Sequence, residues 1–106
     1  MKIVYKDKEI VVVKQNTFIK RFMGIMFRRK KIDYALWFDR CNSIHTFFCR
    51  QDIQVIMTDK SDKILYVNNC LGRGKIVIKK GCYNVYEMPP DYFFNVKVND
   101  YIEKRK

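Results

Sequence analysis

The sequence predicts a mostly β domain of the α+β class, with one main helix and short helical turns. Its 106 residues leave room for a single domain over 1–106 with a real core. Isoleucine, valine, tyrosine and phenylalanine dominate the apolar residues and occur in short runs, which favours strands. Apolar residues make up 48% of the chain and aromatic residues 15%, which argues against disorder because such a chain can bury enough surface to offset ordering entropy.

Short apolar runs predict the strands. The first two runs, 3–6 and 10–14, are separated by three charged residues and predict a hairpin. The polar segment Asp59–Asp62 predicts a turn between two later strands. After a pair of prolines, a short helical turn is expected around 91–95. The remaining runs that predict strands lie at 34–38, 44–50, 53–58, 63–68, 75–79, 83–87 and 96–102.

One stretch changes to helical spacing. Asn16 or Thr17 can cap this helix, because a side-chain oxygen there can accept an orphan backbone N–H. The basic run Arg28–Lys31 suits the helix end, where cations favour the negative pole of the dipole. The apolar residues at i, i+3 and i+4 positions predict one buried face. They are Phe18, Ile19, Phe22, Met23, Ile25, Met26 and Phe27, of which Phe18, Phe22, Met26 and either Ile25 or Ile19 should be largely buried.

The charge of the chain is strongly basic, with 22 Lys and Arg against 11 Asp and Glu and a net charge of +11. Such a balance is typical of proteins that bind nucleic acid, an anionic membrane surface or an acidic partner, and also of merely soluble lysine-rich surfaces. No acid occurs between Glu9 and Asp33. The basic residues in that window are Lys14, Lys20, Arg21, Arg28, Arg29, Lys30 and Lys31.

The four cysteines do not form a recognisable zinc or redox motif. No C-x-x-C pair occurs among Cys41, Cys49, Cys70 and Cys82. The first residues carry no apolar run long enough for a secretory signal or a membrane span. We therefore expect a cytoplasmic protein whose thiols stay reduced, and no intrachain disulfide.

The lone histidine lies in a stretch that reads N-S-I-H-T-F-F-C. On a regular strand Cys41, His45 and Cys49 would share one face, but successive members would lie about 13 Å apart, too far to ligate one zinc ion. A thiol–imidazole pair would need a cysteine from another strand. We expect no metal and no cofactor, and a partly buried, hydrogen-bonded His45.

Several blocks together resemble the domain-of-unknown-function 192 family, an uncharacterised prokaryotic group. They occur in the family's order with compatible spacing across about residues 15–102. Each block alone is a weak signal. The blocks are R-F-M-G-I-M-F-R (Arg21–Arg28), L-W-F (Leu36–Phe38), S-I-H-T-F-F (Ser43–Phe48), I-Q-V-I-M-T-D (Ile53–Asp59), D-K-S-D-K-I-L-Y-V (Asp59–Val67), V-Y-E-M-P-P (Val85–Pro90) and N-D-Y-I (Asn99–Ile102).

The resemblance implies a compact barrel-like β fold with one helix packed near an end, and it implies no established activity. The chain departs from the family pattern at five positions. Gln54 is the most telling departure, because a family aspartate there would carry a charge that an amide lacks. The departures are Cys49 for methionine, Asp52 for proline, Gln54 for aspartate, Met57 for phenylalanine and Asn99 for glycine.

Function is predicted only coarsely. We expect a non-enzymatic binding or accessory domain for an anionic partner or a small ligand. The alternatives are non-specific nucleic-acid binding, or an enzyme that uses His45 with Glu87 as acid and base. Glu87 could instead be a buried acid paired with Arg28 or Arg50. The candidate ligand-binding residues are Arg28, Arg29, Lys30, Lys31, His45, Thr46 and Arg50.

Overall fold

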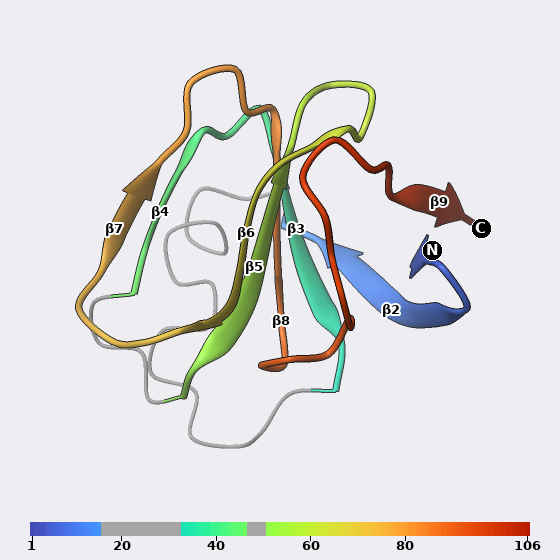
Figure 1. Ribbon diagram of the computed structural model, residues 1–106, viewed down its shortest axis with the longest axis horizontal. Helices are drawn as coiled ribbons and strands as arrows, with labels where there is room; N and C mark the ends of the chain where they lie inside the picture. The colour runs from blue at the N-terminus through green and yellow to red at the C-terminus, as the bar shows by residue number, and fades with distance from the viewer. Residues whose placement is uncertain (16–32, 47–50) are drawn as a thin grey trace.

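The computed structural model describes residues 1–15, 33–46 and 51–106, and these segments are built from β-strands and turns. Two sheets are present in the described part of the chain (Figure 1). The strands are β1 (Lys2–Tyr5), β2 (Lys8–Lys14), β3 (Ala35–Asp39), β4 (Ser43–His45), β5 (Ile53–Thr58), β6 (Ile64–Leu71), β7 (Ile76–Ile78), β8 (Asn84–Met88) and β9 (Glu103–Arg105).

The larger sheet has seven strands in the order β6-β5-β8-β3-β2-β1-β9. Its neighbours pair antiparallel, except that β2 and β3 run parallel. A parallel pair needs a long crossover, and the connection between β2 and β3 runs through residues 16–32, which lie outside the described part. The smaller sheet pairs β4 with β7 and lies apart from the larger one, as Figure 1 shows.

The larger sheet curls until the two ends of its strand order meet. Lys63, just before β6, forms an isolated bridge with Tyr101, just before β9. The backbone N–H of Ile64 donates to Asp100 O over 2.8 Å, and that of Ile102 donates to Asp62 O over 3.0 Å. The domain therefore approaches a barrel at this end, which fits the barrel-like shape that the family resemblance implies.

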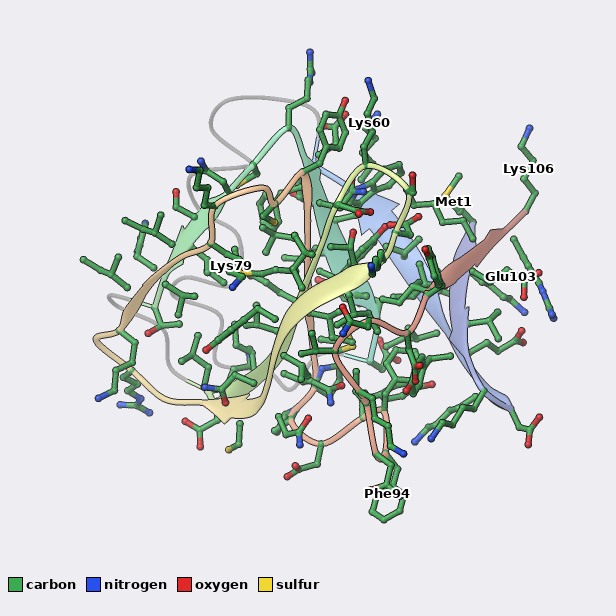
Figure 2. The ribbon with its side chains drawn as sticks, turned by 45° about the horizontal axis from the view of Figure 1, so that its top comes forward. Met1, Lys60, Lys79, Phe94, Glu103 and Lys106 are labelled. Atoms are coloured by element: carbon green, nitrogen blue, oxygen red, sulfur yellow. The ribbon has the colours of Figure 1, made fainter. Side chains whose placement is uncertain are left out.

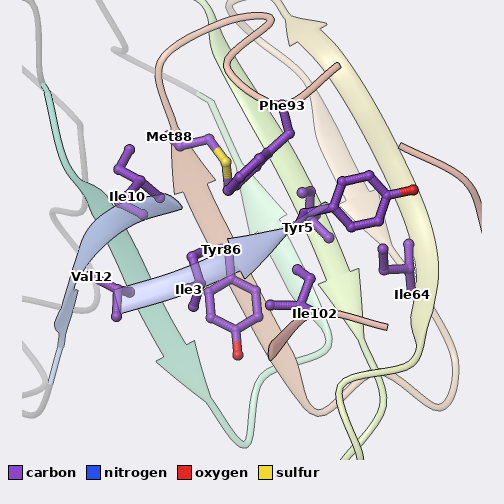
Figure 3. Close-up of a cluster of buried hydrophobic side chains, with 11 residues drawn as sticks. Ile3, Tyr5, Ile10, Val12, Ile64, Tyr86, Met88, Phe93 and Ile102 are labelled. Carbon is purple, nitrogen blue, oxygen red and sulfur yellow. The ribbon is translucent and has the colours of Figure 1, made fainter. Parts of the chain in front are cut away.

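Each face of the curled sheet buries its own apolar cluster. Strand β8 supplies both, because alternate side chains point to opposite faces: Tyr86 and Met88 enter one cluster and Val85 enters the other. The first cluster lies among the sheet, the β1–β2 hairpin and the segment around Phe93 (Figure 3). The second lies between the sheet and the β4–β7 pair, which contributes Ile44 and Val77.

The predicted fold class was wrong in its helices. No helix occurs in residues 1–15, 33–46 or 51–106, although the mostly β, barrel-like part of the prediction agrees with the structure. Around 91–95 the expected helical turn is replaced by turns and bends. Asp91 and Asn95 adopt left-handed backbone angles there (φ 54° and 52°), which a right-handed helix does not allow. The backbone N–H of Phe93 donates to the Gln54 side chain instead of a helical carbonyl.

The expected main helix falls in residues that the structure does not describe, and so does the expected burial of Phe18, Phe22 and Met26. The predicted strands are confirmed for most runs, and β5 matches its predicted bounds of 53–58. The predicted last strand, 96–102, was wrong: these residues form a turn and a single bridge at Tyr101, and β9 lies beyond them at Glu103–Arg105. Of the predicted strand 44–50, only its first residues are described, in β4.

Candidate functional site

A hollow of about 300 Å³ opens where β3 ends and β8 begins. The last pair of the β3–β8 ladder is Asp39 with Asn84. Beyond it, the chain leaves β3 toward β4 and returns from β7 toward β8, so two loops meet at this edge. The lining residues are Arg40, Cys41, Asn42, Ser43 and Cys82.

The backbone of the two loops is held by hydrogen bonds between them. Cys41 N donates to Tyr83 O over 3.0 Å, and Lys79 N donates to Asn42 O over 2.9 Å. Arg40 adopts a left-handed conformation (φ 50°), which costs a non-glycine residue about 1–3 kcal/mol. Gly81, on the other loop, has φ 85°, a conformation that glycine adopts without strain. The hollow is therefore framed by fixed backbone, and the strained residue in it is an arginine.

The charges around the hollow sum to a positive value. The carboxylate of Asp39 lies between two cations, with Lys14 Nζ 3.4 Å and Arg40 Nε 3.7 Å from its Oδ2 atom. These three side chains together carry a net charge of about +1. Lys79 and Lys80 follow β7 on the second loop, and the described residues that line the hollow include no acid. An anion would thus meet a favourable potential here.

Both thiols of the hollow donate hydrogen bonds to backbone carbonyls. Cys41 Sγ donates to Ser43 O over 3.1 Å, and Cys82 Sγ donates to Asn84 O over 3.2 Å. Burial, with a further contribution from nearby Cys41, raises the pKa of Cys82 to about 11. A thiol with such a pKa is a poor nucleophile near neutral pH, because the thiolate is the reactive form. The chemistry of this hollow therefore favours binding over covalent reaction.

The cysteines that the structure describes carry free thiols: Cys41, Cys70 and Cys82. Cys49 lies outside the described residues, so the absence of an intrachain disulfide stays a prediction. Across residues 1–15, 33–46 and 51–106, no group of three or more His, Cys, Asp or Glu side chains is arranged to hold a metal ion. In the same ranges, no helix has the length and apolar character to cross a bilayer.

Glu87 is buried on the face of the large sheet that packs against β4 and β7. It pairs in register with Leu36 on one side and Val55 on the other, two members of the second apolar cluster. Glu87 is 7% exposed, and desolvation raises the pKa of its carboxyl to about 8. No hydrogen bond or ion pair joins it to another described residue. The predicted partners, Arg28 and Arg50, lie outside the described part of the chain.

His45 lies on a different sheet from Glu87, and Thr46 follows His45 directly after the end of β4. His45 is the last residue of β4 and pairs with Ile76 of β7. The Thr46 hydroxyl donates to Gly72 O over 2.7 Å and accepts from Lys75 N over 2.8 Å, so it fixes the turn that leads into β7. The structure therefore shows Thr46 in a supporting role, whereas Arg28, Arg29, Lys30, Lys31 and Arg50 fall outside the described residues.

A buried polar network around Asp62 escaped the sequence analysis. Its Oδ1 atom accepts hydrogen bonds from the side chains of Thr58, Asn84 and Tyr86 over 3.0, 3.2 and 2.8 Å. Its Oδ2 atom lies 3.2 Å from Lys104 Nζ. Burial and the neighbouring Asp62 charge raise the pKa of the Tyr86 hydroxyl, so Tyr86 acts as a donor. Asn84, a polar residue at the start of an apolar strand, could have indicated this network in the sequence, because a buried amide requires hydrogen-bond partners.

Gln54, the departure from the family pattern, has a structural role in this chain. Its Oε1 atom accepts from Phe93 N over 3.0 Å, and its Nε2 atom donates to Phe93 O over 3.0 Å. Nε2 also donates to Asn69 Oδ1 over 2.9 Å. An ionised aspartate could not donate either of these bonds. The amide therefore clamps the segment after β8 onto the sheet.

The comparisons with known proteins agree with the fold. No family model matches the chain. It is 33% identical over 96 residues to a "UPF0127 protein" of Thermococcus sibiricus, a match that spans 83% of this chain and 62% of the relative. The chain thus spans less than two thirds of that relative's length.

Two solved structures share the fold at low sequence identity. A proposed transcription regulator from Sinorhizobium meliloti superposes with a TM-score of 0.80 at 15% identity, over 96% of this chain and 89% of that one. A protein of unknown function from Novosphingobium aromaticivorans superposes with a TM-score of 0.81 at 12% identity, over 97% and 82%. The chain therefore shares its fold with these two bacterial proteins, and it is similar in sequence to an uncharacterised archaeal protein.

Proposed function

We propose that the protein is a non-enzymatic binding module for a small anionic ligand, and that the hollow beside Arg40 is its binding site. One observation carries the proposal. Arg40, Asn42 and Ser43, whose side chains can donate hydrogen bonds, line one hollow together with Cys41 and Cys82, and no acid occurs among these described lining residues. Phosphate and carboxylate groups need such donors, and a guanidinium fork matches their geometry.

The size of the hollow limits the ligand. Its volume of about 300 Å³ lies at the small end of ligand pockets, which span about 300–1,000 Å³. A phosphate, a small carboxylate or the phosphate end of a larger molecule would fit. The overall charge of +11 supports the choice of an anion, because the field of the whole protein attracts negative ligands.

We also propose that the chain belongs to the domain-of-unknown-function 192 family and works in the cytoplasm. The ordered blocks of residues 15–102 support the family, as does the similarity to an uncharacterised archaeal protein. The free thiols of Cys41, Cys70 and Cys82 support the compartment, because a reducing cytoplasm keeps thiols unpaired.

Calorimetric titration with inorganic phosphate at low salt tests the proposed site. Arg40→Asn removes the guanidinium and keeps a residue that tolerates a left-handed backbone. It should weaken phosphate binding about tenfold, the effect of losing a charge-assisted contact. Arg105→Asn is the matched control, because Arg105 also pairs with a neighbouring carboxylate, Glu103, at the far end of the chain.

Arg105→Asn should leave the affinity for phosphate unchanged. Equal loss in both variants would show that only net charge matters. No heat of binding at millimolar phosphate or succinate would refute the site.

A second candidate function is acid–base catalysis by Glu87. The pKa of about 8 favours it, because a buried carboxyl with such a pKa can exchange protons near neutral pH. Any turnover that depended on this acid would be lost in Glu87→Gln and would survive in Arg105→Asn. Turnover that survives Glu87→Gln would eliminate this candidate.

A further inference from the structure

The outward face of the β4–β7 pair carries two exposed aliphatic side chains. Ile76 and Ile78 alternate along β7 and are 61% and 70% exposed, whereas Val77 between them packs into the second apolar cluster. The ladder pairs His45 with Ile76 and Ser43 with Ile78, so these four side chains share the outward face. Figure 1 shows the two strands at the edge of the molecule, away from both termini.

Basic residues flank these isoleucines. Lys75 precedes Ile76 directly, Lys79 and Lys80 follow Ile78, and Arg73 lies two residues before Lys75. No acid occurs from Lys63 to Tyr86. Side chains in this part of the molecule, including the labelled Lys79, can be followed in Figure 2. We call the surface formed by Ile76, Ile78, Lys75, Lys79 and Lys80 the β7 face.

We propose that the β7 face docks on the surface of an anionic lipid bilayer, a binding function beyond the small-ligand site, which it adjoins through Lys79 and Lys80. Exposed apolar residues with exposed cations at both ends of their strand match a headgroup region that is negative at its surface and apolar just below it. In this arrangement Ile76 and Ile78 enter the acyl boundary, while Lys75, Lys79 and Lys80 contact lipid phosphates.

The small size of the face favours a bilayer over a protein partner. Strands of three residues extend only about 10 Å, and paired strands lie about 5 Å apart. A stable protein interface buries about 800 Å² on each partner, far more than such a face offers. A bilayer requires no matching shape, and each basic residue near an anionic surface adds its own attraction.

Vesicle co-sedimentation tests the proposal with the intact chain. The probes are vesicles of phosphatidylcholine alone and vesicles of phosphatidylcholine with phosphatidylglycerol in equal parts. The protein should bind the anionic vesicles at low salt and hardly bind the neutral ones, and binding should weaken as salt screens the lysines. Ile76→Ser with Ile78→Ser should lower the affinity about tenfold, because two aliphatic side chains no longer leave water.

Two matched controls test whether binding depends on the β7 face itself and not on exposed apolar surface or net charge elsewhere on the protein. Val11 and Val13 are 50% and 45% exposed on β2, so Val11→Ser with Val13→Ser removes similar apolar surface elsewhere. Lys79→Gln with Lys80→Gln should lower the affinity about 25-fold, at about fivefold for each charge. Lys97→Gln with Lys106→Gln makes the same change of net charge away from the face and should cost much less.

The results that would overturn the proposal are specific. One is an absence of binding to anionic vesicles at low salt. Another is an equal loss in the β2 and β7 serine variants, or a loss on lysine replacement with none on isoleucine replacement. A dimer in sedimentation equilibrium that only the Ile76→Ser, Ile78→Ser variant abolishes, without vesicle binding, would assign the face to a second copy of the chain. Melting temperatures of the variants within a few degrees of the parent show that the substitutions leave the fold intact.

Discussion

The buried carboxyl of Glu87 should make the domain less stable as the pH rises. Its pKa is raised from the usual 4.5 to about 8 because burial penalises the charged form. Between these two values the unfolded chain is ionised at this position and the folded chain is protonated, so folding takes up a proton. The stability that depends on the neutral carboxyl is complete below pH 4.5 and is lost as the pH rises through about 8.

The size of the effect follows from the same two values. The free energy of unfolding should fall by about 1.4 kcal/mol per pH unit in this window, or about 3 kcal/mol between pH 5 and pH 7. Glu87→Gln keeps the shape and removes the titration, so this slope should disappear in the variant. Above pH 7 the variant should be more stable than the parent.

Urea denaturation at a series of pH values measures this slope directly. Glu9→Gln is the control, because Glu9 is a surface carboxylate paired with Lys2 and its replacement should keep the slope of the parent. The competing prediction is that Glu87 is ionised and paired with Arg28 or Arg50. In that case the parent would gain stability as the pH rises from 4, and Glu87→Gln would be the less stable protein at pH 7. That result would refute the reasoning.

Three further predictions concern stability and charge. Gln54→Asp should lower the free energy of unfolding by about 2–4 kcal/mol, because the buried Phe93 carbonyl loses its donor and a charge is buried, and urea titration measures it. Asp62→Asn should cost about 3 kcal/mol at neutral pH, because it removes the charge that Lys104 and Tyr86 contact; a melting temperature equal to that of the parent would contradict it. Arg28 lies outside the described residues, and its prediction concerns the basic cluster 28–31. If this cluster binds polyanions, Arg28→Ala should weaken DNA or RNA binding at low salt more than Lys30→Ala does. A lower melting temperature of Arg28→Ala, with no polyanion affinity in the parent, would instead favour an internal ion pair.

The strands could be predicted where local pattern alone decides them. The run 53–58 is apolar apart from Gln54 and Thr58 and is followed by an Asx turn at Asp59, so β5 falls where it was predicted. Strand β9 could not be predicted in this way, because Glu103–Arg105 is polar and becomes a strand only by pairing with β1 at the other end of the chain. The helical turn expected after the prolines failed for a similar reason, since a side chain from β5 captures the Phe93 backbone.

The candidate site was less accessible to sequence analysis than the fold. Arg40 and Cys82 are far apart in the chain and meet only because β3 and β8 pair in register. Neither loop carries a motif that marks it as a site. The sequence analysis instead selected the densest basic run, 28–31, because linear charge density can be read without the fold. The roles of His45 and Thr46 were uncertain for the same reason, since the partners of Thr46 at Gly72 and Lys75 come from a distant turn.

The central claim is that an anion binds in the hollow beside Arg40, and a titration followed by nuclear magnetic resonance tests it most directly. Amide resonances of ¹⁵N-labelled protein would be recorded while inorganic phosphate is added at constant ionic strength. Saturable shifts should be largest at Cys41, Asn42, Ser43 and Cys82, and they should shrink in Arg40→Asn but not in Arg105→Asn. Shifts that are linear in phosphate, or spread over the lysines of the whole surface with none at these four amides, would contradict the claim.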